Sequence, residues 1–349
     1  MQMTFRWFGA DDVIPLEYIR QIPGVSGVVS ALYDVPVGDV WPRDKIVDLA
    51  SLIDAAGLSL AVIESIPVHE DIKLGRPTRD RLADQYAESV RHMGEVGIQV
   101  LCYNFMPIFD WTRTDLAMRQ PDGSTVLAYD HAALSRIDLA RGTGDLPGWA
   151  TAYDAKTLQA LLTAYNEVNA ERLWENLEYF LQRVVPVAES AGVRMAIHPD
   201  DPPWSIFGLP RIVTNSENLE RLTRLVDLPA NGVTFCTGSL GADPANDLPT
   251  MAAKLAARGR IHFAHCRNVK WTGEKKFNES PHPSWLGNVD MYAVLMALHE
   301  SGFTGPIRPD HGRMIWGETG RPGYGLYDRA LGATYLQGLW EGIEKRGPS

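Results

Sequence analysis

The feature that most constrains the fold of this chain is an eightfold alternation of short apolar segments with longer segments of helical periodicity. Each short segment is rich in β-branched or apolar residues and is closed by turn residues, which is typical of a buried strand. The eight candidate strands are Thr4–Trp7, Val25–Ala31, Leu58–Glu64, Gln99–Phe105, Arg194–His198, Gly232–Cys236, Arg260–His265 and Pro306–Asp310. The amphipathic segments between them include Arg43–Ala56, Arg79–Val96, Glu171–Ala191, Asn246–Arg258 and Val289–Glu300. Strands that alternate with helices pair in parallel, so we predict an α/β fold, a closed (β/α)₈ barrel.

The chain is longer than such a barrel requires. It has 349 residues, whereas a minimal barrel needs about 250. The surplus lies mainly between Phe105 and Glu171, after the fourth strand, and includes a helix-like run at Lys156–Asn166. Loops at this end of barrel strands build active sites. We therefore predict one barrel domain over residues 1–349, with residues 106–170 inserted as a helical lid over its mouth.

Charge and cysteine content exclude several classes of function. The formal net charge is −10, which argues against nucleic-acid binding, because such proteins neutralise phosphates with Lys and Arg. No apolar run approaches the ~20 residues that span a bilayer, and Met1–Phe8 has no cationic segment followed by an apolar one. Three scattered cysteines, Cys102, Cys236 and Cys266, fit a reducing compartment. We expect a cytoplasmic protein that binds a small polar molecule, with each thiol either buried in the core or bound to a metal.

The last four predicted strands all end in a side chain that can bind a divalent cation. These terminal residues are His198, Cys236, His265 and Asp310. Taken singly, each has an ordinary explanation as a buried core residue or a turn cap. In a barrel, however, consecutive strand ends are neighbours on one rim, so imidazole, thiolate, imidazole and carboxylate can converge. The coincidence of all four predicts a metal site.

Alternation along the strands supports this placement. Side chains two apart share a face, so Ala196 lies on the same side as His198, and Thr234 on the same side as Cys236. The intervening Ile197 and Phe235 are expected to pack outward against helices. His262 falls on the outer face of its strand, where this scheme gives it no role.

Several long motifs of mixed chemistry cover most of the chain. They are Glu64–Gly75 (ESIPVHEDIKLG), Tyr103–Thr114 (YNFMPIFDWTRT), Ala196–Arg211 (AIHPDDPPWSIFGLPR), FCTGSLG from Phe235, HFAHCRN from His262, Ile307–Arg313 (IRPDHGR) and PGYGL from Pro322. Together they resemble the mannonate dehydratase family. The resemblance implies a xylose-isomerase-like TIM barrel that removes water from D-mannonate to give 2-keto-3-deoxy-D-gluconate in hexuronate catabolism.

The resemblance also implies roles for particular residues. It assigns metal binding to the four strand-end residues already singled out, and an acid/base pair to His311 and Tyr324, without deciding which is acid and which is base. It points to Mn²⁺ or Fe²⁺, although the mixed donor set also admits Zn²⁺. The expected partner is the sugar acid, with no nucleic acid and no membrane. We also expect a homo-oligomer, a dimer, although no pattern in the sequence specifies one.

Other functions stay open at this point. A sugar or sugar-acid isomerase, another lyase or a metal-dependent phosphodiesterase could use the same barrel, and a barrel could bind sugar acids without turning them over. The thiolate is atypical of isomerase sites, which are rich in carboxylates, and the acidic chain gives no sign of an endonuclease's basic face. His69, Glu70 and Asp71 follow the third strand, where they are either substrate contacts or, as the sequence favours, a solvated loop.

Overall fold

The computed structural model describes residues 1–137, 139, 148–150 and 153–346. Eight parallel strands close into a barrel, which confirms the predicted fold. They are β1 (Gln2–Arg6), β2 (Val25–Ser30), β3 (Ser59–Glu64), β4 (Val100–Tyr103), β9 (Arg194–Ile197), β10 (Asn231–Cys236), β11 (Ile261–His265) and β14 (Pro306–Arg308). Around the barrel they follow the order β1-β14-β11-β10-β9-β4-β3-β2. The four strands that carry candidate ligands are therefore contiguous.

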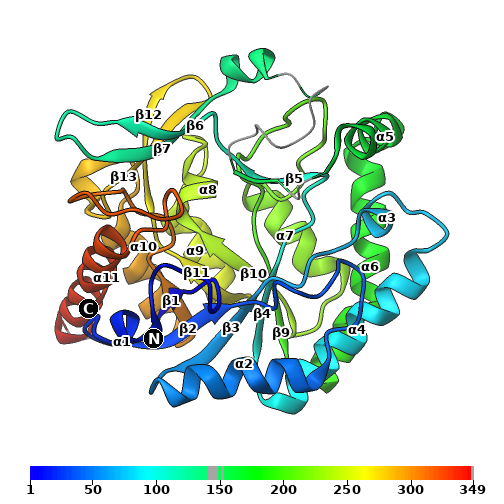
Figure 1. Ribbon diagram of the computed structural model, residues 1–349, viewed down its shortest axis with the longest axis horizontal. Coiled ribbons are helices and arrows are strands. Elements are labelled where there is room, and N and C mark those ends of the chain that lie inside the picture. Colours follow the sequence, from blue (N-terminus) through cyan, green and yellow to red (C-terminus); the bar gives the residue numbers. More distant parts are fainter. Residues whose placement is uncertain (138, 140–147, 151–152, 347–349) are drawn as a thin grey trace.

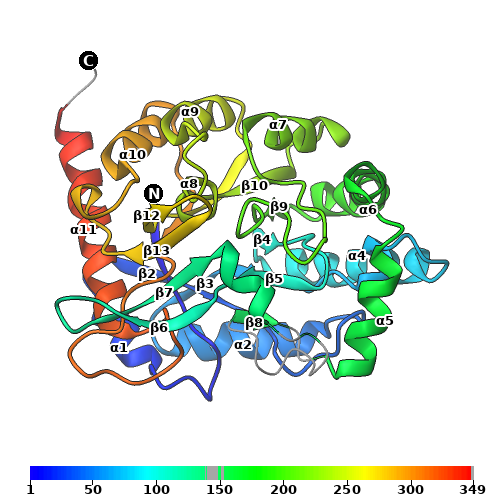
Figure 2. The ribbon, with the colours of Figure 1, turned by 90° about the horizontal axis from the view of Figure 1, so that it is seen from above.

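Helices surround the barrel, as Figure 2 shows from above. The longer ones are α2 (Arg43–Ala55), α4 (Arg79–Val96), α6 (Ala170–Ser190), α7 (Ser216–Leu225), α9 (Leu248–Ala257), α10 (Met291–Glu300) and α11 (Leu326–Arg346). The shorter ones are α1 (Leu16–Arg20), α3 (Glu70–Lys73), α8 (Thr237–Gly241) and the 3₁₀ turn η3 (Ser284–Leu286). Side chains that accept a backbone N–H bond begin α6, α7, α9 and α10; these caps are Asn169, Asn215, Asp247 and Asp290. No helix among the described residues is both long and apolar enough to cross a membrane.

The barrel wall separates two apolar clusters. A small inner cluster includes Val29, Val100 and Ala196, whereas Ile197 and Phe235 belong to the large cluster between strands and helices. This confirms the predicted alternation. The outward-facing His262 packs in that same wall: its Nδ1 lies 3.0 Å from the carbonyl oxygen of Met195. Burial lowers its pKa to about 4, which keeps the ring neutral. His262 is thus a hydrogen-bonded core residue.

The insertion after β4 contains more strand than the predicted helical lid. Its elements are β5 (Phe109–Thr112), β6 (Asp115–Arg119), β7 (Thr125–Asp130), the 3₁₀ turn η1 (His131–Arg136), β8 (Gly148–Ala150) and α5 (Ala155–Tyr165). Only α5 matches the helix expected at Lys156–Asn166. Residues 138, 140–147 and 151–152 of the predicted lid lie outside the described residues. The Gln120–Gly123 turn joins β6 and β7 into a hairpin, a turn composition that favours strands on both sides.

A second insertion, which the sequence did not predict, follows β11. It forms a hairpin of β12 (Asn268–Gly273) and β13 (Lys276–Ser280). β13 pairs with β7, for example Phe277 with Tyr129, so the two insertions form one four-stranded sheet in the order β12-β13-β7-β6. Both insertions leave the barrel at the C-terminal ends of its strands. The sheet therefore lies at the end of the barrel where active sites form, at the upper left of Figure 1.

Candidate active site

The four strand-end residues meet at one point of the barrel rim. His198, Cys236 and His265 each offer a donor atom, and these atoms all lie within 4.8 Å of one another. The Nε2 atom of His198 is 3.2 Å from the Nδ1 atom of His265. Asp310 joins them through Oδ2, which lies 3.7 Å from His265 Nδ1 and 3.8 Å from the Cys236 sulfur. The predicted convergence of imidazole, thiol and carboxylate groups is therefore present.

Local contacts orient the donor atoms of His198 and Cys236. His198 Nδ1 lies 2.7 Å from the carbonyl oxygen of Pro199. A carbonyl only accepts, so Nδ1 carries a proton and Nε2 is the nitrogen directed at the cluster. The sulfur of Cys236 accepts hydrogen bonds from the backbone N–H and the hydroxyl of Ser239, at 3.4 and 3.1 Å. A thiolate, the form of cysteine that binds metals, accepts such bonds well.

Asp310 is held in its ionised form by neighbouring cations. Arg308 Nη2 lies 2.8 Å from its Oδ1 atom, and Arg267 Nε lies 2.7 Å from its Oδ2 atom. Burial disfavours the charged carboxylate, but the surrounding positive charges outweigh it and hold the pKa of Asp310 well below its ordinary value, with Arg308 and Arg267 in direct contact. The residue has a φ of 60°, a left-handed conformation that Asp adopts more readily than most side chains do.

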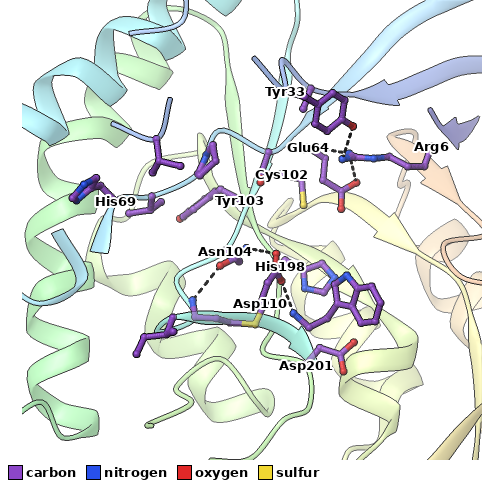
Figure 3. Close-up of a pocket in the computed structure, with 18 of the residues that line it drawn as sticks. Arg6, Tyr33, Glu64, His69, Cys102, Tyr103, Asn104, Asp110, His198 and Asp201 are labelled. Carbon is purple, nitrogen blue, oxygen red and sulfur yellow. Dashed lines mark hydrogen bonds and ion pairs between the residues drawn. The ribbon is translucent and has the colours of Figure 1, made fainter. Parts of the chain in front are cut away.

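The far side of His265 faces a second carboxylate. Its Nε2 atom is 3.7 Å from Glu64 Oε2, and neither atom has a hydrogen-bond partner among the described residues. Glu64, Cys102 and His265 also have donor atoms within 4.8 Å of one another. Glu64 is already paired with two guanidinium groups, however: Arg308 at 3.0 Å and Arg6 at 3.5 Å. These positive charges disfavour a second cation, so Glu64 is better explained as the partner of His265 Nε2 (Figure 3 shows Glu64 between Arg6 and Cys102).

The two residues implied as an acid/base pair are in direct contact. His311 Nε2 lies 2.9 Å from the hydroxyl of Tyr324, and both side chains are buried. His311 Nδ1 lies 3.1 Å from Glu279 Oε1, on β13. Burial lowers the pKa of His311, although Asp310 opposes this, and burial raises the pKa of Tyr324. A neutral imidazole thus faces a protonated phenol.

Buried ion pairs connect the acid/base pair to the ligand cluster. Arg113 lies 2.8 Å from Asp201 Oδ1 and 2.7 Å from Glu279 Oε1. Arg267 contacts the same two carboxylates, at 2.5 Å from Asp201 Oδ2, and also contacts Asp310. Burial opposes ionisation of both carboxylates, but the arginines outweigh it and lower the pKa of Glu279 to about 2. Since every charge in this network has a counter-charge, it can stay buried.

Some of these groups line a cavity of about 630 Å³ at the barrel mouth, whereas Cys236, His265 and Glu279 lie behind its wall. Its wall includes Glu64, His198, Asp310, His311 and Tyr324. The insertion after β4 contributes further wall residues, namely Asp110, Trp111, Tyr153, Thr157 and Leu161. The cavity can hold a six-carbon sugar acid, since ligand pockets typically measure about 300–1,000 Å³.

The loop that follows β3 is less exposed to solvent than its sequence favours. His69 and Glu70 line the cavity, and Glu70 is buried and paired with Lys73 at 2.7 Å. Asp71 instead binds Arg76 and Thr78. Glu64 and Glu279 were not predicted to belong to the site. Glu64 ends the third predicted strand, so the strand-end argument could have found it, whereas Glu279 lies in a hairpin that gave no comparable signal.

The donor set fits a divalent cation. Two imidazoles, one of them with its outer nitrogen already hydrogen-bonded, a sulfur that accepts two hydrogen bonds and an ionised carboxylate converge from four strands. The separation of 3.2 Å between the two imidazole nitrogens matches neighbouring ligands of one ion, whose metal–nitrogen distances are about 2.1 Å. His265 Nδ1 faces this cluster while its Nε2 faces Glu64, as expected for a metal-bound histidine backed by a carboxylate.

Comparison with known proteins places the chain in a family. D-mannonate dehydratase (UxuA) matches residues 1–348. Mannonate dehydratase 2 of Halalkalibacterium halodurans is 59% identical over 343 residues, which are 98% of this chain and 99% of that protein. The crystal structure of mannonate dehydratase from Streptococcus suis serotype 2 has a TM-score of 0.93 and 49% identity, and covers 100% of this chain and 96% of that one. A xylose isomerase-like TIM barrel protein from Mycobacterium smegmatis, with a TM-score of 0.54 and 15% identity over 94% of this chain and 88% of that one, shares the fold. The chain therefore belongs to the D-mannonate dehydratase family.

Proposed function

We propose that the protein is a hydro-lyase that removes water from D-mannonate to give 2-keto-3-deoxy-D-gluconate, in hexuronate catabolism. The observation that carries this proposal is the position of the His311–Tyr324 pair directly beside the four converging donor groups. Dehydration of a hydroxy acid needs both features, because the proton next to a carboxylate is too weakly acidic for a side-chain base alone. The family relationship supports the choice of substrate.

We propose that His198, Cys236, His265 and Asp310 bind one divalent cation, Mn²⁺ or Fe²⁺. Zn²⁺ has the higher intrinsic affinity for such a donor set, so metal availability would decide among the three ions. The bound cation would act as a Lewis acid on the substrate carboxylate or its neighbouring hydroxyl, offsetting the negative charge that develops when C2 loses its proton.

The contacts of His311 support one assignment of roles within the acid/base pair. The Glu279 carboxylate can only accept, which favours a proton on His311 Nδ1 and a free electron pair on Nε2, and burial, which raises the pKa of Tyr324, favours the protonated phenol. We propose that the C2–H proton passes to His311 Nε2 and that the C–H electron pair forms the C2–C3 double bond as the C3–O bond breaks. The departing hydroxide takes the phenolic proton of Tyr324 and leaves as water. His311 then returns its proton to Tyr324 across their 2.9 Å contact, and the enol product tautomerises to the 2-keto acid.

The activity can be tested with purified protein under reducing conditions. Incubation with Mn²⁺ and D-mannonate should give one equivalent of 2-keto acid for each equivalent of mannonate consumed. D-gluconate, which differs only in configuration at C2, should react much more slowly because its C2 proton lies on the other face from His311. An absence of 2-keto acid in metal-replete protein would contradict the proposed function.

We further propose that residues 1–349 form one barrel domain and that the segment 106–170 covers its mouth. Trp111 and Leu161, which lie in this segment, line the cavity and support the proposal. Cleavage of the segment by a protease should become slower when D-mannonate is bound. Equal cleavage with and without substrate would mean that the segment does not respond to the ligand.

We also propose a cytoplasmic homodimer. Trp285 and Trp316 are 77% and 74% exposed, and side chains of this kind are commonly covered in interfaces. Light scattering of the purified protein should give twice the mass of one chain. A monomer mass at micromolar concentration would contradict the dimer.

A further inference from the structure

We infer that Glu279 is the positioning residue of the acid/base pair: it fixes the orientation and tautomer of His311 so that Nε2 faces Tyr324 and the substrate. The inference deepens the proposed dehydration and rests on it where activity is measured. Glu279 lies on β13, so the β12–β13 hairpin places this carboxylate at the barrel mouth.

The contacts of Glu279 leave it little freedom. Its side chain is 1% exposed. Oε1 accepts from Arg113 Nη2 at 2.7 Å and contacts Arg267 Nη1, so two guanidinium groups grip the carboxylate that faces His311. Charge-assisted bonds of this kind are short and strongly directional. The carboxylate is therefore a fixed, ionised acceptor and not a mobile surface group.

This acceptor determines which nitrogen of His311 carries the proton. A carboxylate only accepts hydrogen bonds, so the 3.1 Å contact requires a proton on Nδ1. A neutral imidazole has a single ring proton, which leaves Nε2 to accept from Tyr324 at 2.9 Å. Without Glu279 the ring could adopt the other tautomer, with Nε2–H and the Tyr324 hydroxyl both donors. The pair could not then exchange a proton as the mechanism requires.

Precedent for the size of such an effect comes from serine proteases, where a buried aspartate holds the catalytic histidine in the same way. Its replacement by asparagine leaves the geometry intact but lowers kcat about 10⁴-fold, because the tautomer is wrong. Glu279 differs in its origin: it lies in an insertion that pairs with another insertion, since β13 pairs with β7. The β12–β13 hairpin thus affects the proposed proton transfer through the side chain of Glu279.

Asp201 is a matched control for this inference. It neutralises the same two arginines as Glu279, at 2.8 Å from Arg113 Nη1 and 2.5 Å from Arg267 Nη2, and it is equally buried at 1% exposed. Its hydrogen bonds among the described residues do not include His311. Asp201→Asn therefore reports the cost of losing one negative charge beside the arginines. Glu279→Met loses the same charge and also removes the acceptor of His311, because both arginines and His311 reach the same Oε1 atom, which an amide oxygen could replace but a thioether cannot.

The first measurement compares steady-state kinetics of Mn²⁺-loaded wild type, Glu279→Met and Asp201→Asn with D-mannonate. We expect Glu279→Met to lower kcat about 10²–10⁴-fold, while KM and Mn²⁺ content stay within about threefold of wild type, because Glu279 is not among the four proposed ligands. Asp201→Asn should stay within about tenfold of wild type in kcat. Equal losses of kcat in the two variants would overturn the inference.

The second measurement needs no substrate. Nitrogen-15 spectra of histidine-labelled, Zn²⁺-loaded protein report the tautomer of each ring, and His311→Asn identifies the His311 signals among the nine histidines of the chain. We expect the Nδ1–H form in wild type and Asp201→Asn, and a shift toward Nε2–H in Glu279→Met, which has no acceptor for Nδ1–H. Unchanged His311 signals in Glu279→Met would overturn the inference.

Misfolding of the variant and failure of the proposed function can each be distinguished from failure of this inference. If Glu279→Met does not fold, Glu279→Asp keeps the charge for the arginines but withdraws the carboxylate from His311 by one methylene. Glu279→Asp should fold and lose kcat, and a wild-type kcat would overturn the inference. If wild type forms no 2-keto acid, the proposed function fails, whereas the nitrogen-15 spectra still test the role of Glu279.

Discussion

The two sides of the site are built from different parts of the chain. On the side where we propose a metal, called the metal side below, the four donor groups lie at or just beyond the C-terminal ends of four contiguous barrel strands, β9, β10, β11 and β14. On the acid/base side, His311 depends on Glu279 from the β12–β13 hairpin and on Tyr324 from the loop that follows β14. The barrel therefore positions the metal side directly, whereas the acid/base side also depends on the pairing of β13 with β7 between the two insertions.

A glutamate lies behind a histidine on each side of the site. Glu64 Oε2 lies 3.7 Å from His265 Nε2, and Glu279 Oε1 lies 3.1 Å from His311 Nδ1. Arginines hold both carboxylates. We therefore expect each carboxylate to orient its histidine, Glu64 for metal binding by His265 and Glu279 for proton transfer by His311. Substitutions on the metal side should therefore lower metal affinity, whereas substitutions on the acid/base side should lower turnover.

The largest expected effect is on the acid/base side. Tyr324→Phe removes the phenolic proton but keeps the ring that packs 4.9 Å from the His311 ring. We expect kcat to fall about 10³-fold with Mn²⁺ content unchanged, as measured by keto-acid formation and elemental analysis. A wild-type rate would show that Tyr324 is not the acid. A loss of metal would show that the two sides are not separable.

Cys236→Ser should act on the metal side. A serine hydroxyl is a harder and weaker ligand than a thiolate, so we expect Mn²⁺ affinity to fall at least about tenfold. Titration calorimetry of metal-stripped protein measures this, and excess Mn²⁺ should restore part of the turnover. The control is Cys266→Ala, which removes a buried neighbouring thiol outside the four-donor cluster. Equal affinity in both variants would argue against Cys236 as a ligand.

Glu64→Gln tests the carboxylate behind the metal side. Loss of the partner of a metal-binding histidine typically costs about 10–100-fold in metal affinity. We expect the lower end of this range, because Glu64 and His265 are 3.7 Å apart. Glu70→Gln is the control, since Glu70 also has a carboxylate that lines the cavity but pairs with Lys73 and Tyr165. Similar Mn²⁺ affinities in the two variants would remove Glu64 from the metal side.

The smallest expected effect concerns packing on the acid/base side. The Trp111 ring lies 5.0 Å from the His311 ring, and such aromatic contacts contribute about 0.5–1.5 kcal/mol. Trp111→Leu should therefore lower kcat by roughly two- to tenfold without changing Mn²⁺ affinity. Trp316→Leu, at an exposed tryptophan, should change neither. A change in metal affinity with Trp111→Leu would mean that this side chain supports both sides.

The sequence allowed the convergence of the four proposed metal-binding side chains to be predicted, although their role as ligands stays a proposal. Strand ends in a closed barrel are neighbours whatever the loops between them do, so His198, Cys236, His265 and Asp310 could be brought together from periodicity alone. His311 and Tyr324 were identified through the family resemblance, and their direct contact is seen only in the structure. Glu64 could have been found by extending the strand-end argument to the third strand.

The acid/base side could not be predicted in the same way. The four-stranded sheet joins residues around Tyr129 and Phe277, which are far apart in the chain, and short antiparallel strands have no periodicity strong enough to indicate their partners. The insertion after β4 was accordingly expected to be helical, whereas most of its described elements are strands.

The sequence by itself determined the barrel, its strand order and the ring of donor groups. Hydrophobic periodicity and the alternation of strands with helices are local properties of the chain, and closure of the barrel makes consecutive strands neighbours. Only the tertiary structure decided how those groups are supported. The pairing of β13 with β7, the sharing of Arg113 and Arg267 between Asp201 and Glu279, and the proton on His311 Nδ1 all depend on contacts between distant segments. Such contacts follow from packing and charge neutralisation in the folded interior, where the whole chain sets the energy of each side chain.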